Sequence, residues 1–265
     1  MMVLIIRGAR QKSNALNAGI TVLRWRRKMK ALILNGSARG QKGVTGTLVE
    51  AITRGLMEAK AGVQTFEIQS LTISPCRACL TCMHKTPGEC SIEDDMGLIY
   101  EACKTSDLLI LATPLYVDTM TAQLKTVMDR SIACMQPFLV KDVAGRIRHP
   151  FTWRMPSSFL LLSTSGFPEQ ENFLPLIATF RAQAANFSSQ AIGEICISGS
   201  IALQMEPELL KRHLTLLEEA GRHLGATGNI PEDILQNLNT PPVGVDRYLQ
   251  ATAKYEQWCR SKLNI

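Results

Sequence analysis

Short apolar runs alternate with amphipathic segments along most of this 265-residue chain. The run Asp107–Ala112 is almost uninterrupted in its apolar character, which is typical of a parallel strand covered on both faces. A chain in which such strands alternate with helices folds into a doubly wound α/β sheet. We therefore predict five strands in a parallel sheet, at Lys30–Asn35, Val63–Ile68, Asp107–Ala112, Ser158–Ser163 and Ala191–Ile197.

The segments between these runs carry apolar residues at helical spacing, as in Leu48, Ile52 and Leu56. Gly62 follows that segment and is interpreted as the C-terminal cap of its helix. The helical pattern continues beyond residue 225, so we expect a domain at residues 29–225 and a helical extension at 226–265 packed on it. The predicted helices are Leu48–Ala61, Asp94–Lys104, Thr121–Ala133, Leu174–Asn186, Glu206–Leu224 and Asp246–Leu263.

The formal net charge of +6 is distributed unevenly. Residues 1–28 hold seven basic residues and no acid, which leaves 22 basic against 23 acidic residues in 29–265. A nucleic-acid-binding domain would carry its positive charge on the folded body, so nucleic acid is not an expected partner. No apolar run approaches the ~20 residues of a membrane helix, so no membrane association is expected. We interpret residues 1–28 as a poorly ordered basic extension, with a transit peptide as the alternative.

A loop rich in glycine and hydroxyl side chains, residues 36–47, follows the first strand and leads into the first helix. Gln41 precedes Lys42 and Gly43 follows it, so the loop fails the Walker A pattern, and the four-residue spacing of Gly36 and Gly40 fails the dinucleotide fingerprint. Backbone N–H groups, hydroxyls and a helix N-terminus suit an anion. The loop therefore predicts a site for a terminal phosphate monoester.

Four of the eight cysteines, Cys76, Cys79, Cys82 and Cys90, lie within fifteen residues. Eight cysteines in a chain of this length are too few for a disulfide scaffold, so we expect a reducing, cytoplasmic location. Three interpretations of the four-cysteine stretch remain open. The thiolates could hold a [4Fe–4S] cluster, a zinc ion, or no metal.

Five motifs in this chain occur in the order found in the flavodoxin-like NAD(P)H-dependent FMN reductases, and within them in the iron–sulfur flavoproteins. They are the Gly-Ser-x-Arg loop from Gly36, the cysteine stretch, Asp94-Asp95-Met96, Thr113-Pro114-Leu115-Tyr116, and Gln123-Leu124-Lys125 with Asp129-Arg130. The chain resembles this family over roughly residues 30–200. The resemblance implies a flavodoxin-like five-stranded parallel sheet of order 2-1-3-4-5, here with extra C-terminal helices.

The resemblance also implies bound FMN, placed by three loops. These loops follow strands one, three and four, and in an open α/β sheet ligands collect at the carboxyl ends of strands. Relatives commonly carry an amide or hydroxyl where this chain has Val44, so backbone N–H groups would serve the phosphate there. Expected around the phosphate are Ser37, Arg39, Thr45, Gly46 and Thr47, and expected around the flavin ring are Pro114, Leu115, Tyr116, Val117, Thr164, Ser165 and Gly166, with Phe167 beside them.

The activity implied by the resemblance is an FMN oxidoreductase. NAD(P)H would pass a hydride to FMN N5, and the reduced flavin would pass electrons to a quinone, free flavin, nitroaromatic or metal-ion acceptor. The alternative is an electron carrier that shuttles electrons between a [4Fe–4S] cluster at the four cysteines and FMN, with ferredoxin as partner. A flavin-binding regulatory or storage protein is a third hypothesis.

The connection at residues 134–157 is too long for a simple loop between a helix and a strand. It carries basic and aromatic residues, among them Lys141, Arg146, Arg148, Phe151 and Trp153. It is either a lid or subunit contact that offers cations to a nicotinamide dinucleotide, or a packing arm. A homodimer or homotetramer is implied by the resemblance, with this connection and the helix Thr121–Ala133 as contacts.

Overall fold

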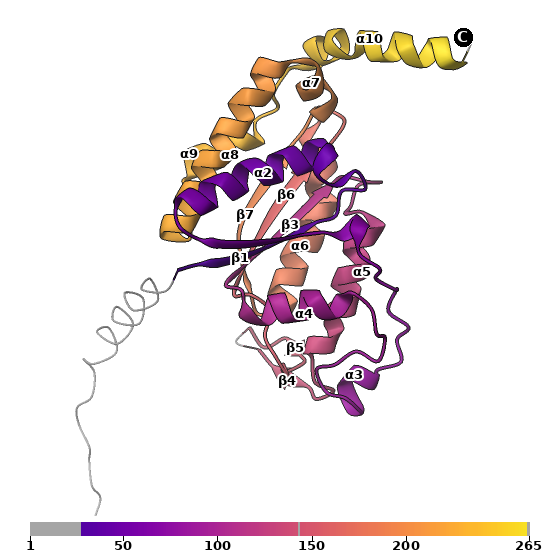
Figure 1. Cartoon of the computed structure of the whole chain (residues 1–265), viewed down its shortest axis with the longest axis vertical. Coiled ribbons are helices and arrows are strands. Elements are labelled where there is room, and N and C mark those ends of the chain that lie inside the picture. The colour runs from indigo at the N-terminus through magenta and orange to yellow at the C-terminus, as the bar shows by residue number, and fades with distance from the viewer. Residues whose placement is uncertain (1–27, 143, 264–265) are drawn as a thin grey trace, which may run out of the picture.

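A computed structural model describes residues 28–142 and 144–263. The predicted basic extension therefore lies, except for Lys28, outside the described residues. A five-stranded parallel sheet has the order β2-β1-β3-β6-β7, which confirms the expected flavodoxin-like order (Figure 1). Its strands are β1 (Lys30–Asn35), β2 (Gly62–Glu67), β3 (Leu108–Pro114), β6 (Ser158–Thr164) and β7 (Gln190–Ile197), and a short antiparallel pair joins β4 (Val140–Lys141) to β5 (Ile147–Arg148).

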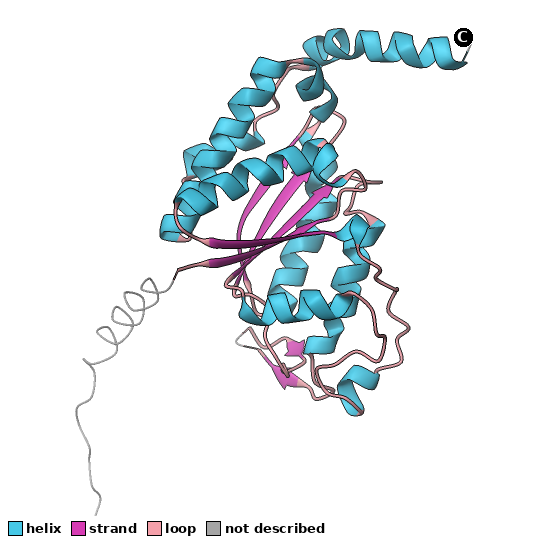
Figure 2. Cartoon of the chain, in the orientation of Figure 1, coloured by secondary structure: helices cyan, strands magenta, loops and turns pink. Residues whose placement is uncertain are grey.

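Helices cover both faces of the sheet, which is why its central strands are apolar on both sides (Figure 2). The helices are α2 (Val44–Glu58), α3 (Thr81–His84), α4 (Met96–Thr105), α5 (Ala122–Arg130), α6 (Leu174–Asn186), α7 (Ser200–Met205), α8 (Pro207–Thr227), α9 (Glu232–Asn239) and α10 (Val245–Leu263). One core packs α4, α5 and α6 on side chains such as Leu109 and Leu161, and the other packs α2, α8 and α9 on Ile110 and Leu160.

The predicted cap at Gly62 is wrong. Helix α2 ends at Glu58, and Gly62 is already the first residue of β2, paired with Lys30. The left-handed residue in this turn is Lys60, with φ of 65°. A lysine adopts this conformation less readily than a glycine, so the preference for glycine at helix C-termini placed the predicted cap at the nearest glycine.

Several helix boundaries also differ from their predictions, those of α2 and α5 among them. Helix α2 begins at Val44 rather than Leu48, because the first turn carries Thr45 and Gly46 and so lacks the apolar spacing used to place it. The predicted helix Thr121–Ala133 is an α-helix only to Arg130 and continues as a 3₁₀ helix at Ser131–Cys134.

The C-terminal region has two parts with different surroundings. Helix α9 buries Ile234 and Leu238 in the core shared by β7 and α8. Helix α10 extends away from the body of the molecule, and Tyr248 near its first turn is its buried residue (Figure 1). None of the described helices combines the length and apolar character needed to cross a bilayer.

Helices α2 and α8 pack so closely that their backbones touch at two glycines, where no side chain lies between them. A Cβ on Gly55 would lie 2.0 Å from the carbonyl oxygen of Glu218, and one on Gly221 would lie 2.4 Å from that of Ile52. The neighbours in both cases are backbone atoms, which cannot move without shifting a helix. The covering layer of this sheet face therefore depends on glycine at the crossing.

We expect Gly55→Ala to lower the free energy of unfolding by about 2 kcal/mol or more, because overpacking outweighs the gain in helix propensity. Gly97→Ala in α4 is the matched control, since a Cβ there meets no atom within 4 Å. The control should be neutral or stabilising by up to about 1 kcal/mol. Urea unfolding of the two variants checks this, and equal stability of both would contradict the crossing argument.

Candidate functional site

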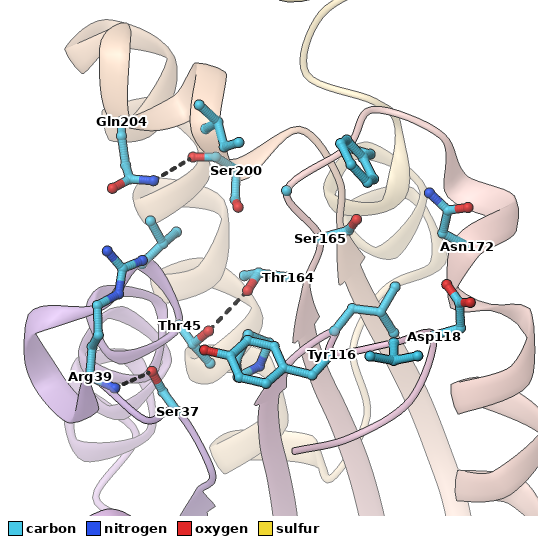
Figure 3. Close-up of a pocket in the computed structure, with 17 residues that line it drawn as sticks. Ser37, Arg39, Thr45, Tyr116, Asp118, Thr164, Ser165, Asn172, Ser200 and Gln204 are labelled. Atoms are coloured by element: carbon cyan, nitrogen blue, oxygen red, sulfur yellow. Dashed lines mark hydrogen bonds between the residues drawn. The ribbon is translucent and has the colours of Figure 1, made fainter. Parts of the chain in front are cut away.

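A cavity of about 420 Å³ opens at the carboxyl edge of the sheet (Figure 3). Four loops line it, and each follows one of the strands β1, β3, β6 and β7, as expected for an open α/β sheet. The lining residues are Ser37, Arg39, Val44, Thr45, Pro114, Leu115, Tyr116, Val117, Asp118, Thr164, Ser165, Gly166, Phe167, Asn172, Ser200, Ile201 and Gln204.

Ten of the twelve predicted cofactor residues line this cavity, and Gly46 and Thr47 do not. Gly46 instead lets α2 pack on the preceding loop, because a Cβ there would lie 2.4 Å from the carbonyl oxygen of Gly40. The Thr47 hydroxyl donates to the carbonyl oxygen of Gly43, 3.3 Å away, within the first turn. Both residues therefore support the conformation of the loop without contributing to the lining of the cavity.

One end of the cavity offers backbone N–H groups, hydroxyls and a guanidinium. Helix α2 begins there without a side-chain cap among the described residues, so the N–H groups of its first turn are available. The Thr45 hydroxyl lies 2.9 Å from that of Thr164, which joins the loops after β1 and β6. The Arg39 guanidinium forms no side-chain hydrogen bond or ion pair within the described residues, and the Arg39 backbone N–H donates to the Ser37 hydroxyl over 3.3 Å at this end (Figure 3).

Close contacts beneath the loop fix its path. The Thr121 hydroxyl donates to the carbonyl oxygen of Gly36 over 2.7 Å, and a Cβ on Gly36 would lie 2.7 Å from Cβ of Leu124. A Cβ on Gly43 would lie 2.9 Å from Oγ of Ser37. The buried Asn35 carboxamide accepts from the N–H of Ser37 over 3.1 Å. These glycines are needed for close approach rather than for flexibility.

The other end of the cavity is bounded by a tight turn at residues 116–119. Tyr116 and Thr119 exchange backbone hydrogen bonds of 2.9 and 3.2 Å, and the two residues between them, Val117 and Asp118, have φ of 47° and 61°. Positive φ at both central positions is the type I′ pattern. A β-branched residue is strained there, and Val117 is 96% exposed, so its side chain gains little burial in return.

Large exposed apolar side chains frame the same end. Tyr116 is 50% exposed and Phe167 is 65% exposed, and both line the cavity. Exposed aromatic faces at a cavity mouth suit a flat apolar ring.

The sequence did not indicate five of the lining residues. Ser200, Ile201 and Gln204 come from α7, a six-residue helix that is too short to show a periodic pattern. Asn172 belongs to a 3₁₀ turn before α6, and Asp118 to the left-handed turn. Parallel pairing of β7 with β6 is what brings α7 to the cavity.

The four-cysteine loop, which includes α3, contributes no residue to the lining of the cavity. Cys76 and Cys79 are exposed, Cys90 is half-buried and Cys82 is buried. Hydrogen bonds from Thr81 and Ser91 lower the pKa of the Cys79 thiol to about 7. Burial, followed by the nearby charges of the other three thiols, raises the pKa of Cys82. Cys82 therefore lies near enough to each of the other three thiols to interact with them electrostatically.

Proximity is not coordination, however. Within residues 28–142 and 144–263, no three histidine, cysteine or acidic side chains are grouped so that they could hold a metal ion. The donor chemistry matches a thiolate-bound metal, whereas this conformation of the loop does not assemble the ligands.

A buried ion pair closes the two ends of the cysteine loop. The Arg130 guanidinium donates to both carboxylate oxygens of Asp94, over 2.9 and 3.1 Å, and to the carbonyl oxygens of Ser74 and Ile92. The Asp94 carboxylate also accepts from the N–H of Ser74 over 2.9 Å. The side chains of Arg130 and Asp94 are only 1% and 5% exposed. This set of bonds, the Arg130 clasp, holds the loop independently of any metal.

The connection at residues 134–157 packs against the cysteine loop rather than the cavity. The Trp153 indole donates to the carbonyl oxygen of Gly88 over 2.9 Å, and its ring lies 5.5 Å from that of Tyr100. None of its described residues lines the cavity. Within one chain, its cations are therefore not offered to a ligand in the cavity.

We expect Asp94→Asn to lower the free energy of unfolding by about 3 kcal/mol at pH 7, because the variant leaves Arg130 buried without its counter-charge. Burial by itself would raise the pKa of Asp94, but hydrogen bonds from Arg130 and two backbone N–H groups outweigh burial and lower that pKa below its usual value. The stabilisation is therefore full above the unfolded-state pKa and is lost as the pH falls through the folded-state pKa.

Unfolding of both proteins across acid pH measures this, and the difference between wild type and Asp94→Asn should close in acid. Asp129→Asn is the matched control, since Asp129 pairs with Lys125 at the surface with both side chains 50% exposed. We expect it to change stability by less than about 1 kcal/mol. A pH-independent gap for Asp94→Asn would rule out the ion pair as its cause.

Comparison with known proteins connects this geometry to a family. Residues 29–148 match the model of the NADPH-dependent FMN reductase family. An iron-sulfur flavoprotein of Archaeoglobus fulgidus is 36% identical over 104 residues, which are 39% of this chain and 46% of that protein. The chain spans about half the length of the curated relatives it matches.

Solved structures confirm the fold. An NAD(P)H:quinone oxidoreductase from Methanothermobacter marburgensis is 17% identical with a TM-score of 0.56, over 75% of this chain and 96% of that one. An FMN-dependent NADH-azoreductase from Bacillus anthracis, in complex with FMN, is 14% identical with a TM-score of 0.54, over 74% of this chain and 99% of that one. The predicted resemblance is therefore confirmed: this chain has the flavodoxin-like fold and, over residues 29–148, is similar to the NADPH-dependent FMN reductases.

Proposed function

We propose that this protein is an FMN-dependent oxidoreductase that takes electrons from NAD(P)H and passes them to a small-molecule acceptor such as a quinone, flavin, nitroaromatic or metal ion. The observation that carries the proposal is the joining, in one cavity, of an anion-binding end and an end framed by aromatic side chains. We further propose a cytoplasmic homodimer or homotetramer.

The anion-binding end fits a phosphate monoester such as that of FMN. Arg39 offers a guanidinium without a competing acid, Ser37 and Thr45 offer hydroxyls, and the first turn of α2 offers N–H groups. Val44 contributes no polar side chain, so its backbone would serve the phosphate. A Cβ at position 43 would crowd the Ser37 hydroxyl, so glycine at this position leaves room beside that hydroxyl.

The remaining walls suit the flavin ring. Pro114, Leu115 and Tyr116 follow β3, and Phe167 follows β6, so apolar surface lies on two sides. The backbone N–H of Gly166 would complete the polar contacts of the ring, since that of Ser165 already donates to the carbonyl oxygen of Ile197 over 3.0 Å. The loops are tied to one another, since the N–H of Leu115 donates to the carbonyl oxygen of Thr164 over 2.7 Å and the N–H of Ser200 to that of Ser165 over 2.8 Å.

The chain's residues act by binding and positioning. Among the described residues that line the cavity there is no histidine, cysteine or lysine that could serve as a catalytic acid or base. FMN, when bound, supplies the hydride-accepting chemistry. In the net reaction NAD(P)H and one proton reduce a quinone to its hydroquinone and leave NAD(P)⁺. Tyr116 and Phe167 would hold the reacting rings in contact and exclude water from them.

We expect Arg39→Gln to weaken FMN binding about ten- to hundredfold, which is the value of a charge-assisted hydrogen bond. Riboflavin, which lacks the phosphate, should bind both proteins equally. Lys42→Gln removes the same charge from the same loop, but Lys42 does not line the cavity, so FMN should bind this control like wild type. Equilibrium dialysis measures all three, and equal losses for FMN and riboflavin would place Arg39 away from the phosphate.

Steady-state oxidation of NADH and NADPH by FMN-loaded protein tests the activity itself. We expect turnover with a neutral quinone as acceptor. Failure to oxidise either nucleotide with a quinone, free flavin, nitroaromatic or ferric complex would exclude the proposed reductase. Bound flavin without turnover would then favour the storage or regulatory hypothesis.

A second candidate is an electron carrier that exchanges electrons between a [4Fe–4S] cluster and FMN, with ferredoxin as partner. Two observations favour it: the loop brings four thiols together, and the curated relatives are iron-sulfur flavoproteins. Cys76, Cys79, Cys82 and Cys90 would be the ligands, and the loop would have to draw them closer. A zinc ion at the same thiolates is the rival.

Metal analysis of protein purified without oxygen distinguishes these cases. A cluster predicts about four iron and four sulfide per chain, whereas a tetrahedral zinc site predicts about one zinc. Cys90→Ser should remove most of the metal, and Cys259→Ser, which alters a thiol on α10, should retain it. A metal-free protein with full flavin content would exclude the carrier.

A further inference from the structure

The cavity carries opposite charges at its two ends. Among the described residues that line it, Arg39 is the only base and Asp118 the only acid. Figure 3 places Arg39 with Ser37 at one end and Asp118 with Asn172 at the other, with Tyr116 between them. A ligand that satisfies Arg39 with its phosphate therefore leaves Asp118 to whatever occupies the opposite end.

The Asp118 carboxylate is available for that role. It forms no hydrogen bond or ion pair with any described residue, whereas acids elsewhere, such as Asp142, Glu194 and Glu206, are paired with arginines. The left-handed turn holds Asp118 at the rim, because φ of 61° is well tolerated by aspartate. The neighbouring Asn172 adds an amide of either hydrogen-bonding sense and no opposing charge.

We propose that Asp118 determines the charge class of the electron acceptor, so that cationic and neutral aromatic acceptors bind at this end in preference to anionic ones. The identity of the ligands as electron acceptors rests on the proposed function, whereas the charge preference rests on the cavity alone. An exposed carboxylate acts through water, so its effect is moderate and depends on ionic strength.

Asp118→Asn tests the proposal with little change in shape, since asparagine also adopts positive φ readily. Glu171→Gln is the matched control, because it removes the same charge from an exposed residue that is next to Asn172 in sequence but outside the cavity lining. The probes are N-methylphenazinium, 1,2-naphthoquinone and 1,2-naphthoquinone-4-sulfonate, which are cationic, neutral and anionic. Equilibrium dialysis against oxidised, FMN-loaded protein gives their dissociation constants without turnover.

We expect Asp118→Asn to tighten sulfonate binding, and to weaken phenazinium binding, by about three- to tenfold each relative to the neutral quinone at low salt. Both ratios should approach wild type as the salt rises from about 0.01 to about 0.5 M. The same shifts should appear in kcat/KM with NAD(P)H, and Glu171→Gln should show neither.

The outcomes separate the two proposals. Unchanged ratios in Asp118→Asn, or equal shifts in Glu171→Gln, would overturn the role of Asp118 even when NAD(P)H oxidation is normal. Shifted binding ratios without NAD(P)H oxidation would uphold the charge preference and exclude the proposed reductase.

Discussion

The parallel hydrogen-bond ladder of the sheet is the constraint on which the site depends. β1, β3, β6 and β7 pair in a register that ends all four at the same edge, so loops from distant parts of the chain meet there. The strand pairing brings these loops together, and side-chain hydrogen bonds between them then stabilise the arrangement. The bond between Thr45 and Thr164 and the one from Thr121 to Gly36 are short links between loops that the ladder has already brought together.

The molecule treats its charges in two different ways. Arg130 and Asp94 are buried and bound to each other and to backbone groups, so their interactions stabilise the cysteine loop. Arg39 and Asp118 stand at opposite ends of the cavity without partners among the described residues. A charged side chain without a partner in a concave site can bind a charged group of a ligand. A buried ion pair cannot, because each charge is already neutralised by its partner. The charge distribution therefore separates the structural loop from the binding cavity.

How far the sequence predicts this structure depends on the range of the interactions involved. The run Asp107–Ala112 is recognisable as a buried strand because consecutive apolar residues reflect burial on both of its faces. The glycines and hydroxyls of residues 36–47 predict a phosphate site from local sequence in the same way, and that site stays a prediction. Gln204 and Asn172 reach the cavity only through tertiary placement of short elements, so no local pattern reveals them. The turn at Lys60 misled the prediction because the left-handed residue was not the glycine.

The cysteine loop shows that its metal content and its folding are separate questions. Small metal domains unfold without their ion because the ligands supply most of their long-range contacts. Here Cys82 and Met83 are 7% exposed and pack in the main core, and the Arg130 clasp fixes both loop ends. The described loop thus has a folded form in which Cys82 lies near the other three thiols and which the Arg130 clasp holds without a metal ligand. Folding of this segment therefore does not require a metal at the thiols.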